Sequence, residues 1–298
     1  MLTIFTTAKP FRGHSAIIQR NAIQSWKRLD PSVEIFIFGD DWGTAEVCQD
    51  LKLQHVRIIR KNKHGTKYLA NIYDQAQEIA RYDVLCHVNC DILLMSDFRR
   101  AVESVTNLRD RYLMAGRRWD VDIREPIDFQ HAQWEERLRS FALQTNRQRP
   151  AQWIDYFVFP KGLYYREIPE FVIGRPGWDN WLLWYARSSG ASLVDASSAV
   201  CAIHQNHDYS YHPDGERGVW EGEEAQENYR LLEGKRKFRS LEDATHILQG
   251  NRLRPNYNRW IVQAQRGSQR WITPIWFHLL DISRPMRHRI GLRQKART

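Results

Sequence analysis

The sequence predicts an α/β protein with a central, mostly parallel sheet that is flanked by helices. In the first half of the chain, short β-rich runs alternate with segments of helical spacing, a pattern typical of βαβ units. One apolar run of strand length, Asp83–Val88, ends in the polar cluster Asn89-Cys90-Asp91. Because ligand sites of open α/β sheets lie at the carboxyl ends of such strands, this cluster is the first candidate site.

The first half of the chain divides into alternating strands and helices. Ile18, Ala22 and Trp26 recur on one face of a helix, and Val33–Phe38 is β-branched and aromatic like a strand. The expected order is strand Leu2–Thr7, helix His14–Leu29, strand Val33–Phe38, helix Thr44–Leu53, strand His55–Arg60, helix Lys67–Arg81 and strand Asp83–Val88.

The second half is less regular. Residues 119–152 are polar, Arg-rich and poorly periodic, so we expect a long loop that contains one helix, Gln133–Ser140. The other expected elements are helix Phe98–Leu108, strands Tyr112–Arg117 and Ile154–Pro160, helix Asn180–Ser189, strands Leu193–Ala196 and Val200–His204, helix Glu221–Leu232 and the apolar segment Thr273–Leu280.

The net charge of +9 is concentrated at the end of the chain. Residues 252–298 hold ten arginines, one lysine and one acid, so the rest of the chain is close to neutral. This distribution argues against nucleic acid as a partner of residues 1–251. Aromatic residues stand among the tail arginines, which fits either peripheral contact with anionic lipid or a helix packed on the domain. We expect a basic helical extension over 236–298.

The composition also bears on membranes, redox state and location. No window approaches 18 uninterrupted apolar residues, so we expect no transmembrane helix. The first residues lack the pattern of a signal peptide, and the four cysteines show neither a disulfide framework nor zinc spacing. A cytoplasmic location is the default expectation, with peripheral contact at the inner membrane face if the tail binds lipid.

Two segments offer ligands for a divalent cation. Asp91 follows the apolar strand, where a carboxylate can hold a cation that in turn holds a diphosphate, or can simply cap the turn. A later short strand runs into a His-x-x-His pair, His204 and His207, with His212 as a weaker third candidate. Imidazole suits Mn²⁺, whereas an independent zinc site would need further ligands. The alternative is a polar surface loop.

Asp179 stands at the start of a predicted helix, in the segment Gly174–Trp181. A carboxylate in this position can act as the general base that takes a proton from an acceptor hydroxyl. Trp178 and Trp181 offer apolar faces on which a sugar ring can stack. The structural alternative is that Asp179 only caps the helix, and both can hold at once.

Further candidates stand where a nucleoside or sugar would lie if Asp91 holds the phosphates. Polar residues after parallel strands share one edge of the sheet, and backbone N–H groups before a helix can bind an anion. The candidates are Thr6, Thr7 and Lys9 after the first strand, Asp40 after the second, Gly65, Thr66 and Lys67 before a helix, and Asp155 at the start of an aromatic strand, where a structural role is equally expected.

Over roughly residues 1–235, the order of elements and these four sites resemble the nucleotide-sugar glycosyltransferases of the GT-A fold. Asn89-Cys90-Asp91 is similar to a variant of that family's Asp-x-Asp motif, which binds Mn²⁺ or Mg²⁺. The resemblance implies that Asp91 is a metal ligand completed by a late histidine. It also implies that Asn89, in place of the first acid, offers a carbonyl oxygen or bonds a ribose hydroxyl.

The resemblance implies a metal-dependent glycosyltransferase of the hexosyltransferase type. It would move a sugar from a nucleotide-sugar, expected to be a UDP-sugar, to a hydroxyl of a glycan or lipid-linked glycan, with Asp179 as the base. We expect a catalytic domain over 1–235, with a nucleotide-binding half near 1–118 and an acceptor half near 119–235.

Two alternatives remain open. A sugar nucleotidyltransferase of the same fold would need a Gly-rich basic loop after the first strand, whereas Thr6–Gly13 contains one glycine. A non-catalytic protein that binds carbohydrate or nucleotide-sugar at a membrane surface is favoured by the missing acid at Asn89.

Overall fold

A computed structural model of the chain describes residues 1–107, 111–209, 213–234, 236–258 and 261. Met1–Asn256 is one compact unit, and Tyr257–Thr298 is a second unit that lies mostly outside the described residues. The expected apolar segment Thr273–Leu280 and most of the basic tail therefore also lie outside them. None of the helices in the described part of the chain has the length and apolar content needed to cross a bilayer.

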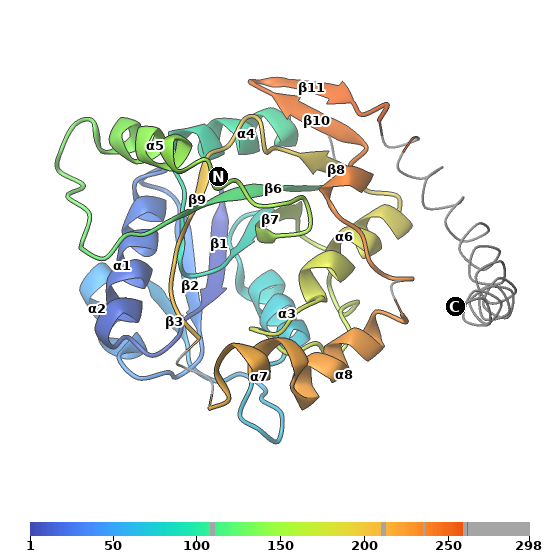
Figure 1. The fold of residues 1–298 in the computed structure, drawn as a ribbon, viewed down its shortest axis with the longest axis horizontal. Coiled ribbons are helices and arrows are strands. Elements are labelled where there is room, and N and C mark those ends of the chain that lie inside the picture. Colours follow the sequence, from blue (N-terminus) through green and yellow to red (C-terminus); the bar gives the residue numbers. More distant parts are fainter. Residues whose placement is uncertain (108–110, 210–212, 235, 259–260, 262–298) are drawn as a thin grey trace, which may run out of the picture. The chain divides into compact units, whose positions relative to one another are not determined.

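The first unit contains a central mixed sheet flanked by helices, which confirms the expected α/β class (Figure 1). The order of the main sheet is β11-β10-β8-β6-β7-β4-β1-β2-β3, and β9 pairs with both β5 and β6. The strands are β1 Thr3–Thr7, β2 Glu34–Phe38, β3 Gln54–Val56, β4 Val84–Val88, β5 Ile92–Leu93, β6 Tyr112–Val121, β7 Ile154–Pro160, β8 Ser192–Asp195, β9 Ala202–Gln205, β10 His246–Gln249 and β11 Arg252–Pro255.

The helices connect these strands and cover the sheet. They are α1 Gly13–Lys27, α2 Thr44–Leu51, α3 Leu69–Ile79, α4 Ser96–Thr106, α5 Trp134–Thr145, α6 Trp178–Ser188, α7 Gly215–Glu221, α8 Glu223–Leu231 and the short 3₁₀ turn Leu241–Asp243.

Successive strand residues point to opposite faces of the sheet, and helices cover both faces, so residues of either parity are buried. Ile4 of β1 belongs to one apolar cluster, which it shares with Trp26 of α1 and with residues of α2 and α4. The next residue, Phe5, belongs to the other cluster with Tyr73 of α3 and Leu182 of α6. In Figure 1, α1 and α2 accordingly lie on one side of the strands, and α3 and α6 lie on the other.

The strands β1, β2, β3 and β4 are parallel neighbours, as expected for βαβ units. The strand β7 then runs antiparallel between β4 and β6, and β6 is parallel to β8. The parallel strands of the first half therefore end at a common edge, and this edge carries the polar residues that follow β1 and β4.

Most of the expected elements are confirmed, with four differences. The expected loop over 119–152 was wrong at its start, because β6 continues to Val121 and pairs there with β9. The strand β3 ends at Val56, so most of the expected strand His55–Arg60 is irregular. The elements β5, β10, β11 and α7 were not predicted. The sheet also continues past residue 235, and its compact unit ends at Asn256.

Candidate functional site

Three paired strands bring residues from distant parts of the chain to one point. The chain leaves β4, passes through Asn89-Cys90-Asp91 and enters β5, where Ile92 pairs with His204 of β9. The strand β9 also pairs with β6, so that His204 lies opposite Asp120. The register of these two ladders therefore places His204 beside both carboxylates.

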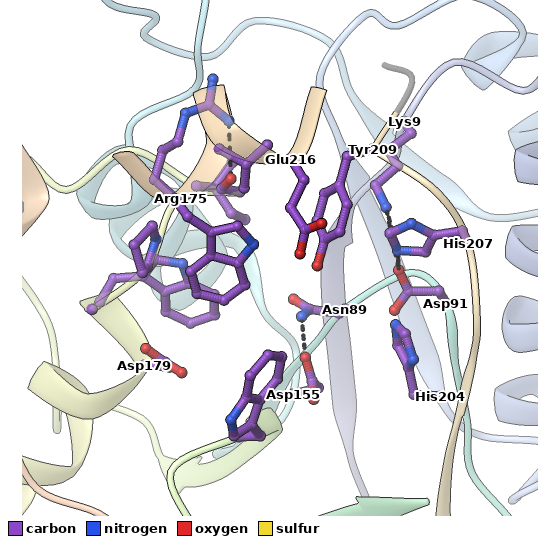
Figure 2. Close-up of a pocket in the computed structure, with 18 of the residues that line it drawn as sticks. Lys9, Asn89, Asp91, Asp155, Arg175, Asp179, His204, His207, Tyr209 and Glu216 are labelled. Carbon is purple, nitrogen blue, oxygen red and sulfur yellow. Dashed lines mark hydrogen bonds and ion pairs between the residues drawn. The ribbon is translucent and has the colours of Figure 1, made fainter. Parts of the chain in front are cut away.

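Asp91, His204 and His207 form a candidate cation site, which we call the cation triad. Each offers one ligand atom, and these atoms lie within 4.8 Å of one another (Figure 2). Oδ1 of Asp91 is buried and has no hydrogen-bond partner among the described residues. A buried, unpartnered carboxylate oxygen is costly unless an ion or water completes it. One carboxylate and two imidazoles suit Mn²⁺, so the residues fit a divalent cation.

Asp120 contacts the cation triad through His204. Its Oδ1 lies 3.4 Å from Nδ1 of His204, and its two oxygens form ion pairs with Arg118 at 3.1 Å and Arg149 at 2.5 Å. Burial raises the pKa of Asp120, but His204 and the two guanidinium groups outweigh it and lower this pKa to about 2. An ionised carboxylate beside a ligating imidazole orients the ring and fixes its tautomer.

Lys9 supplies a positive charge to the same corner. Its Nζ lies 3.5 Å from Oδ2 of Asp91 and 2.8 Å from Nε2 of His207. Burial alone would raise the pKa of Asp91, but the charge of Lys9, the largest opposing cause, holds it well below its usual range. Asp91 is therefore ionised at neutral pH, as a cation ligand must be.

Asn89 and Asp155 form a pair at the middle of the pocket. Nδ2 of Asn89 donates to Oδ1 of Asp155 at 2.7 Å, and the backbone N–H of Asn89 donates to the Asp155 carbonyl at 2.9 Å. The other carboxylate oxygen of Asp155 accepts from Nη1 of Arg118 at 2.6 Å. An aspartate at position 89 would place two carboxylates opposite each other at this distance, and their negative charges would repel. This contact is a physical reason for asparagine at the first position of the motif.

Asp179 lies at the start of α6, on the opposite side of the pocket from Asp91 (Figure 2). Gly177 precedes the helix with a φ of +101°, a backbone conformation that favours glycine and that turns the chain into α6. Burial raises the pKa of Asp179 to about 7, and the charge of Asp155 adds to the rise, whereas backbone N–H groups at the helix start oppose it. A carboxyl group with this pKa can accept a proton near neutral pH.

One cavity of about 1630 Å³ joins these groups. Asn89 and Asp155 lie between the cation triad and Asp179 in Figure 2. The sequence-predicted residues that line this cavity are Thr7, Lys9, Gly65, Thr66, Lys67, Asn89, Asp91, Asp155, Trp178, Asp179, His204 and His207.

Three sequence-predicted residues do not line this cavity, and their packing and ion pairs account for their positions. Thr6 is fully buried because side chains alternate along β1 and only Thr7 turns to the cavity. Asp40 is exposed and forms an ion pair with Lys61 at 2.6 Å. Trp181 is 3% exposed and stacks on Tyr185 at 5.1 Å, so its face is not available to a sugar. The weaker candidate His212 lies outside the described residues.

The structure adds residues that the sequence pattern did not single out. Asp41, next to the expected Asp40, lines the cavity and pairs with Nζ of Lys67. Trp153 lies 5.5 Å from Trp220, ring centre to ring centre, and both line the cavity. The turn at Gly39 is recognisable from the sequence and lies next to Asp41, so Asp41 could have been predicted. No local pattern marks a charged residue inside a strand, such as Asp120.

The site thus belongs to an α/β protein whose cavity lies at the carboxyl ends of parallel strands. No model of a known protein family and no curated protein matches the sequence. Among solved structures, TarS from S. aureus (residues 1-349, in complex with UDP-GlcNAc) has a TM-score of 0.48 and 9% identity, over 69% of this chain and 58% of that one.

Two other solved structures are similar at comparable levels. Glucosyl-3-phosphoglycerate synthase from Mycobacterium tuberculosis, in complex with Mn²⁺, UDP and phosphoglyceric acid, has a TM-score of 0.41 and 12% identity, over 70% of this chain and 71% of that one. A putative nucleotide-diphospho-sugar transferase from Desulfovibrio desulfuricans has a TM-score of 0.43 and 9% identity, over 78% of this chain and 97% of that one.

Proposed function

We propose that this chain is a metal-dependent glycosyltransferase that moves a sugar from a UDP-sugar to a hydroxyl of a glycan or lipid-linked glycan. The observation that supports it is the pairing, in one cavity, of a cation triad with a carboxyl group whose pKa is near 7. Transfer of a sugar from a diphosphate requires stabilisation of the leaving group and removal of the acceptor proton. The two sides of the cavity offer one group for each task.

The donor diphosphate is proposed to lie beside the cation triad. Asp91, His204 and His207 would hold Mn²⁺ or Mg²⁺, and the bound ion would neutralise the charge of the leaving diphosphate. The nucleoside would then lie against the segments that follow β1 and precede α3, where Thr7 and Lys67 line the cavity.

The acceptor is proposed to lie beside Asp179. The acceptor oxygen attacks the anomeric carbon, the bond from that carbon to the diphosphate oxygen breaks, and the acceptor proton passes to the Asp179 carboxylate. A single displacement of this kind inverts the anomeric centre. Trp153 lines the same cavity and offers an apolar ring face to a sugar, whereas Trp178 is 5% exposed and packs against His87 and Phe157.

The test begins with a thermal-shift screen of nucleotide-sugars, each with Mn²⁺ and with EDTA, followed by a transfer assay on the donor that stabilises the protein. We expect selective stabilisation by one UDP-sugar in the presence of Mn²⁺, because a ligand that binds only the folded state raises the midpoint. Full activity of Asp91→Ala would contradict the role of the cation triad. Retention at the anomeric carbon would contradict Asp179 as the base of a single displacement.

A second candidate is a binding protein without turnover. The observation in its favour is Asn89, which stands in place of an acid and donates its side-chain N–H to Asp155. Stabilisation by a nucleotide-sugar, without donor hydrolysis or transfer to any of a panel of glycans, would support this candidate over the enzyme. A nucleotidyltransferase is disfavoured by the single glycine in the segment after β1.

A further inference from the structure

The ammonium group of Lys9 shares a corner with two atoms of the cation triad. Its Nζ lies 2.8 Å from Nε2 of His207 and 3.5 Å from Oδ2 of Asp91, and these two atoms are 3.2 Å apart (Figure 2). The ammonium therefore faces the same nitrogen and the same carboxylate side that a divalent cation would contact.

The hydrogen bonds of His207 show which of its nitrogens carries a lone pair. Nδ1 lies 2.7 Å from the carbonyl oxygen of Asp208, and a carbonyl can only accept, so Nδ1 donates its hydrogen. In the neutral ring, Nε2 then has a lone pair and accepts from the ammonium of Lys9. A metal ion would need this same lone pair.

The backbone of Lys9 is held in place by hydrogen bonds, whereas its side chain is partly exposed. The Lys9 backbone N–H donates to Oε1 of Gln19 at 2.6 Å, and its carbonyl accepts from Nε2 of Gln19 at 2.9 Å. Gln19 is buried in α1, whereas the Lys9 side chain is 27% exposed. A four-carbon side chain on a fixed backbone can withdraw its charged end toward water without disturbing the strand.

We propose that Lys9 is the resident cation of this corner and competes with the divalent ion for Nε2 of His207 and Oδ2 of Asp91. This inference rests on the cation triad of the proposed function. One lone pair cannot serve an ammonium and a metal ion together, and two positive charges in a partly buried corner repel each other. Binding of the ion thus requires the Lys9 side chain to leave.

The experiment measures Mn²⁺ binding to the nucleotide-free chain of residues 1–298, from the electron paramagnetic resonance signal of free Mn²⁺. Lys9→Met removes the competing charge at similar volume, and it should bind Mn²⁺ roughly tenfold more tightly than the wild type, because like-charge repulsion is lost. Lys9→Arg keeps the charge and should bind as the wild type does. Lys9→Gln repeats the test with a polar side chain if Lys9→Met does not fold.

The matched control is Arg147→Met, which removes a positive charge from the lining of the same cavity. Arg147 forms its ion pair with Asp122 at 3.3 Å and is not part of the corner. It should change Mn²⁺ affinity much less than Lys9→Met. Equal effects of the two variants would overturn the proposal, since they would reflect net charge alone.

The remaining outcomes separate this proposal from the proposed function. Mn²⁺ binding to Lys9→Met that is no tighter than to the wild type, or absent from both, would overturn the competition, whatever the transfer assay shows. Tighter binding by Lys9→Met, in a protein that turns over no nucleotide-sugar, would support the competition and contradict the transferase.

Discussion

The two sides of the cavity treat the same chemical group in opposite ways. Asp91 and Asp120 have pKa values that are lowered, whereas the pKa of Asp179 is raised to about 7. Burial acts in the same direction on all three, so the difference comes from their neighbours. Lysine, arginine and histidine surround the first two, and Asp179 has the carboxylate of Asp155 as its charged neighbour.

This contrast separates two chemical tasks within one site. A carboxylate that stays ionised can hold a cation, whereas one that titrates near neutral pH can take up a proton. Pairs of carboxyl groups whose environments separate their pKa values mark the division of roles in many enzymes. The cavity therefore has one side whose carboxylates stay ionised, which we call the charged side, and another whose carboxyl group titrates near neutral pH; in the proposed reaction they would serve the donor diphosphate and the acceptor hydroxyl.

Removing the base should have the largest effect. Asp179→Asn keeps the shape of the side chain but cannot accept the proton, so kcat for transfer should fall by about 10²–10⁴-fold. Donor binding in the thermal-shift assay should persist, because the cation triad is intact. Asp214→Asn, another carboxylate on the cavity lining, is the control. Equal losses in both variants would remove the distinction between the two sides.

The supporting carboxylate of the charged side should matter next. Asp120→Asn weakens the interaction that orients His204, so Mn²⁺ affinity should fall by about 10–100-fold. Asp122→Asn changes an exposed carboxylate two residues away and should leave the affinity unaltered. Isothermal titration calorimetry measures both. An unchanged affinity for Asp120→Asn would show that the ring of His204 is held without it.

Asn89→Asp probes the boundary between the two sides. The new carboxylate would face Asp155 at hydrogen-bond distance, so the free energy of unfolding should fall by about 1–3 kcal/mol. Asn206→Asp is the matched control, because Asn206 makes the same type of bond to Asp122 at 2.8 Å on the exposed surface. Urea unfolding at pH 8 measures both variants. Equal losses would mean that burial of the Asn89 contact has no consequence.

The raised pKa of Asp179 should also cost stability at high pH. Its folded pKa of about 7 exceeds the value of an unfolded aspartate, so between these values the folded state binds more protons, and stability falls as pH rises. Asp179→Asn removes this cost and should stabilise the protein at pH 8 by on the order of 2 kcal/mol. Urea unfolding at pH 4 and pH 8 tests it, and an identical effect at both would contradict the shift.

The last expected effect is on the pH profile of the wild type. A base must be deprotonated, so kcat/KM should rise with pH and level off above about pH 7, with a loss of about tenfold per unit below it. Initial rates between pH 5 and pH 9 with Mn²⁺ saturating give the profile. A plateau that extends below pH 5 would assign the base to a carboxyl group on the charged side.

Local patterns predicted the fold and part of the site. The apolar strand before Asp91 and the turn before Asp179 are specified by residues that are adjacent in the sequence, so both could be recognised without a structure. The alternation along β1 also distinguishes Thr6 from Thr7, although the prediction did not use it. Trp181, one turn after Trp178, was misplaced because helical spacing does not say which face is covered by the core.

Other parts of the site depend on the register of strands that lie far apart in the chain. Asp120 is a buried charge inside β6, and it becomes meaningful only where β9 places His204 opposite it. The bond between Asn89 and Asp155 likewise follows from the antiparallel pairing of β4 with β7. Sequence patterns describe each strand separately, so such cross-strand partners could not be predicted.

The late position of β9 in the chain has a consequence for biosynthesis. Asp91 is translated long before His204 and His207, and the triad forms only when β9 docks between β5 and β6. A nascent chain that ends before β9 therefore has Asp91 without the two histidines of the triad, and it should bind Mn²⁺ weakly. The free energy of ion binding adds to the free energy of folding. A bound ion would therefore stabilise the chain only after β9 has joined the sheet.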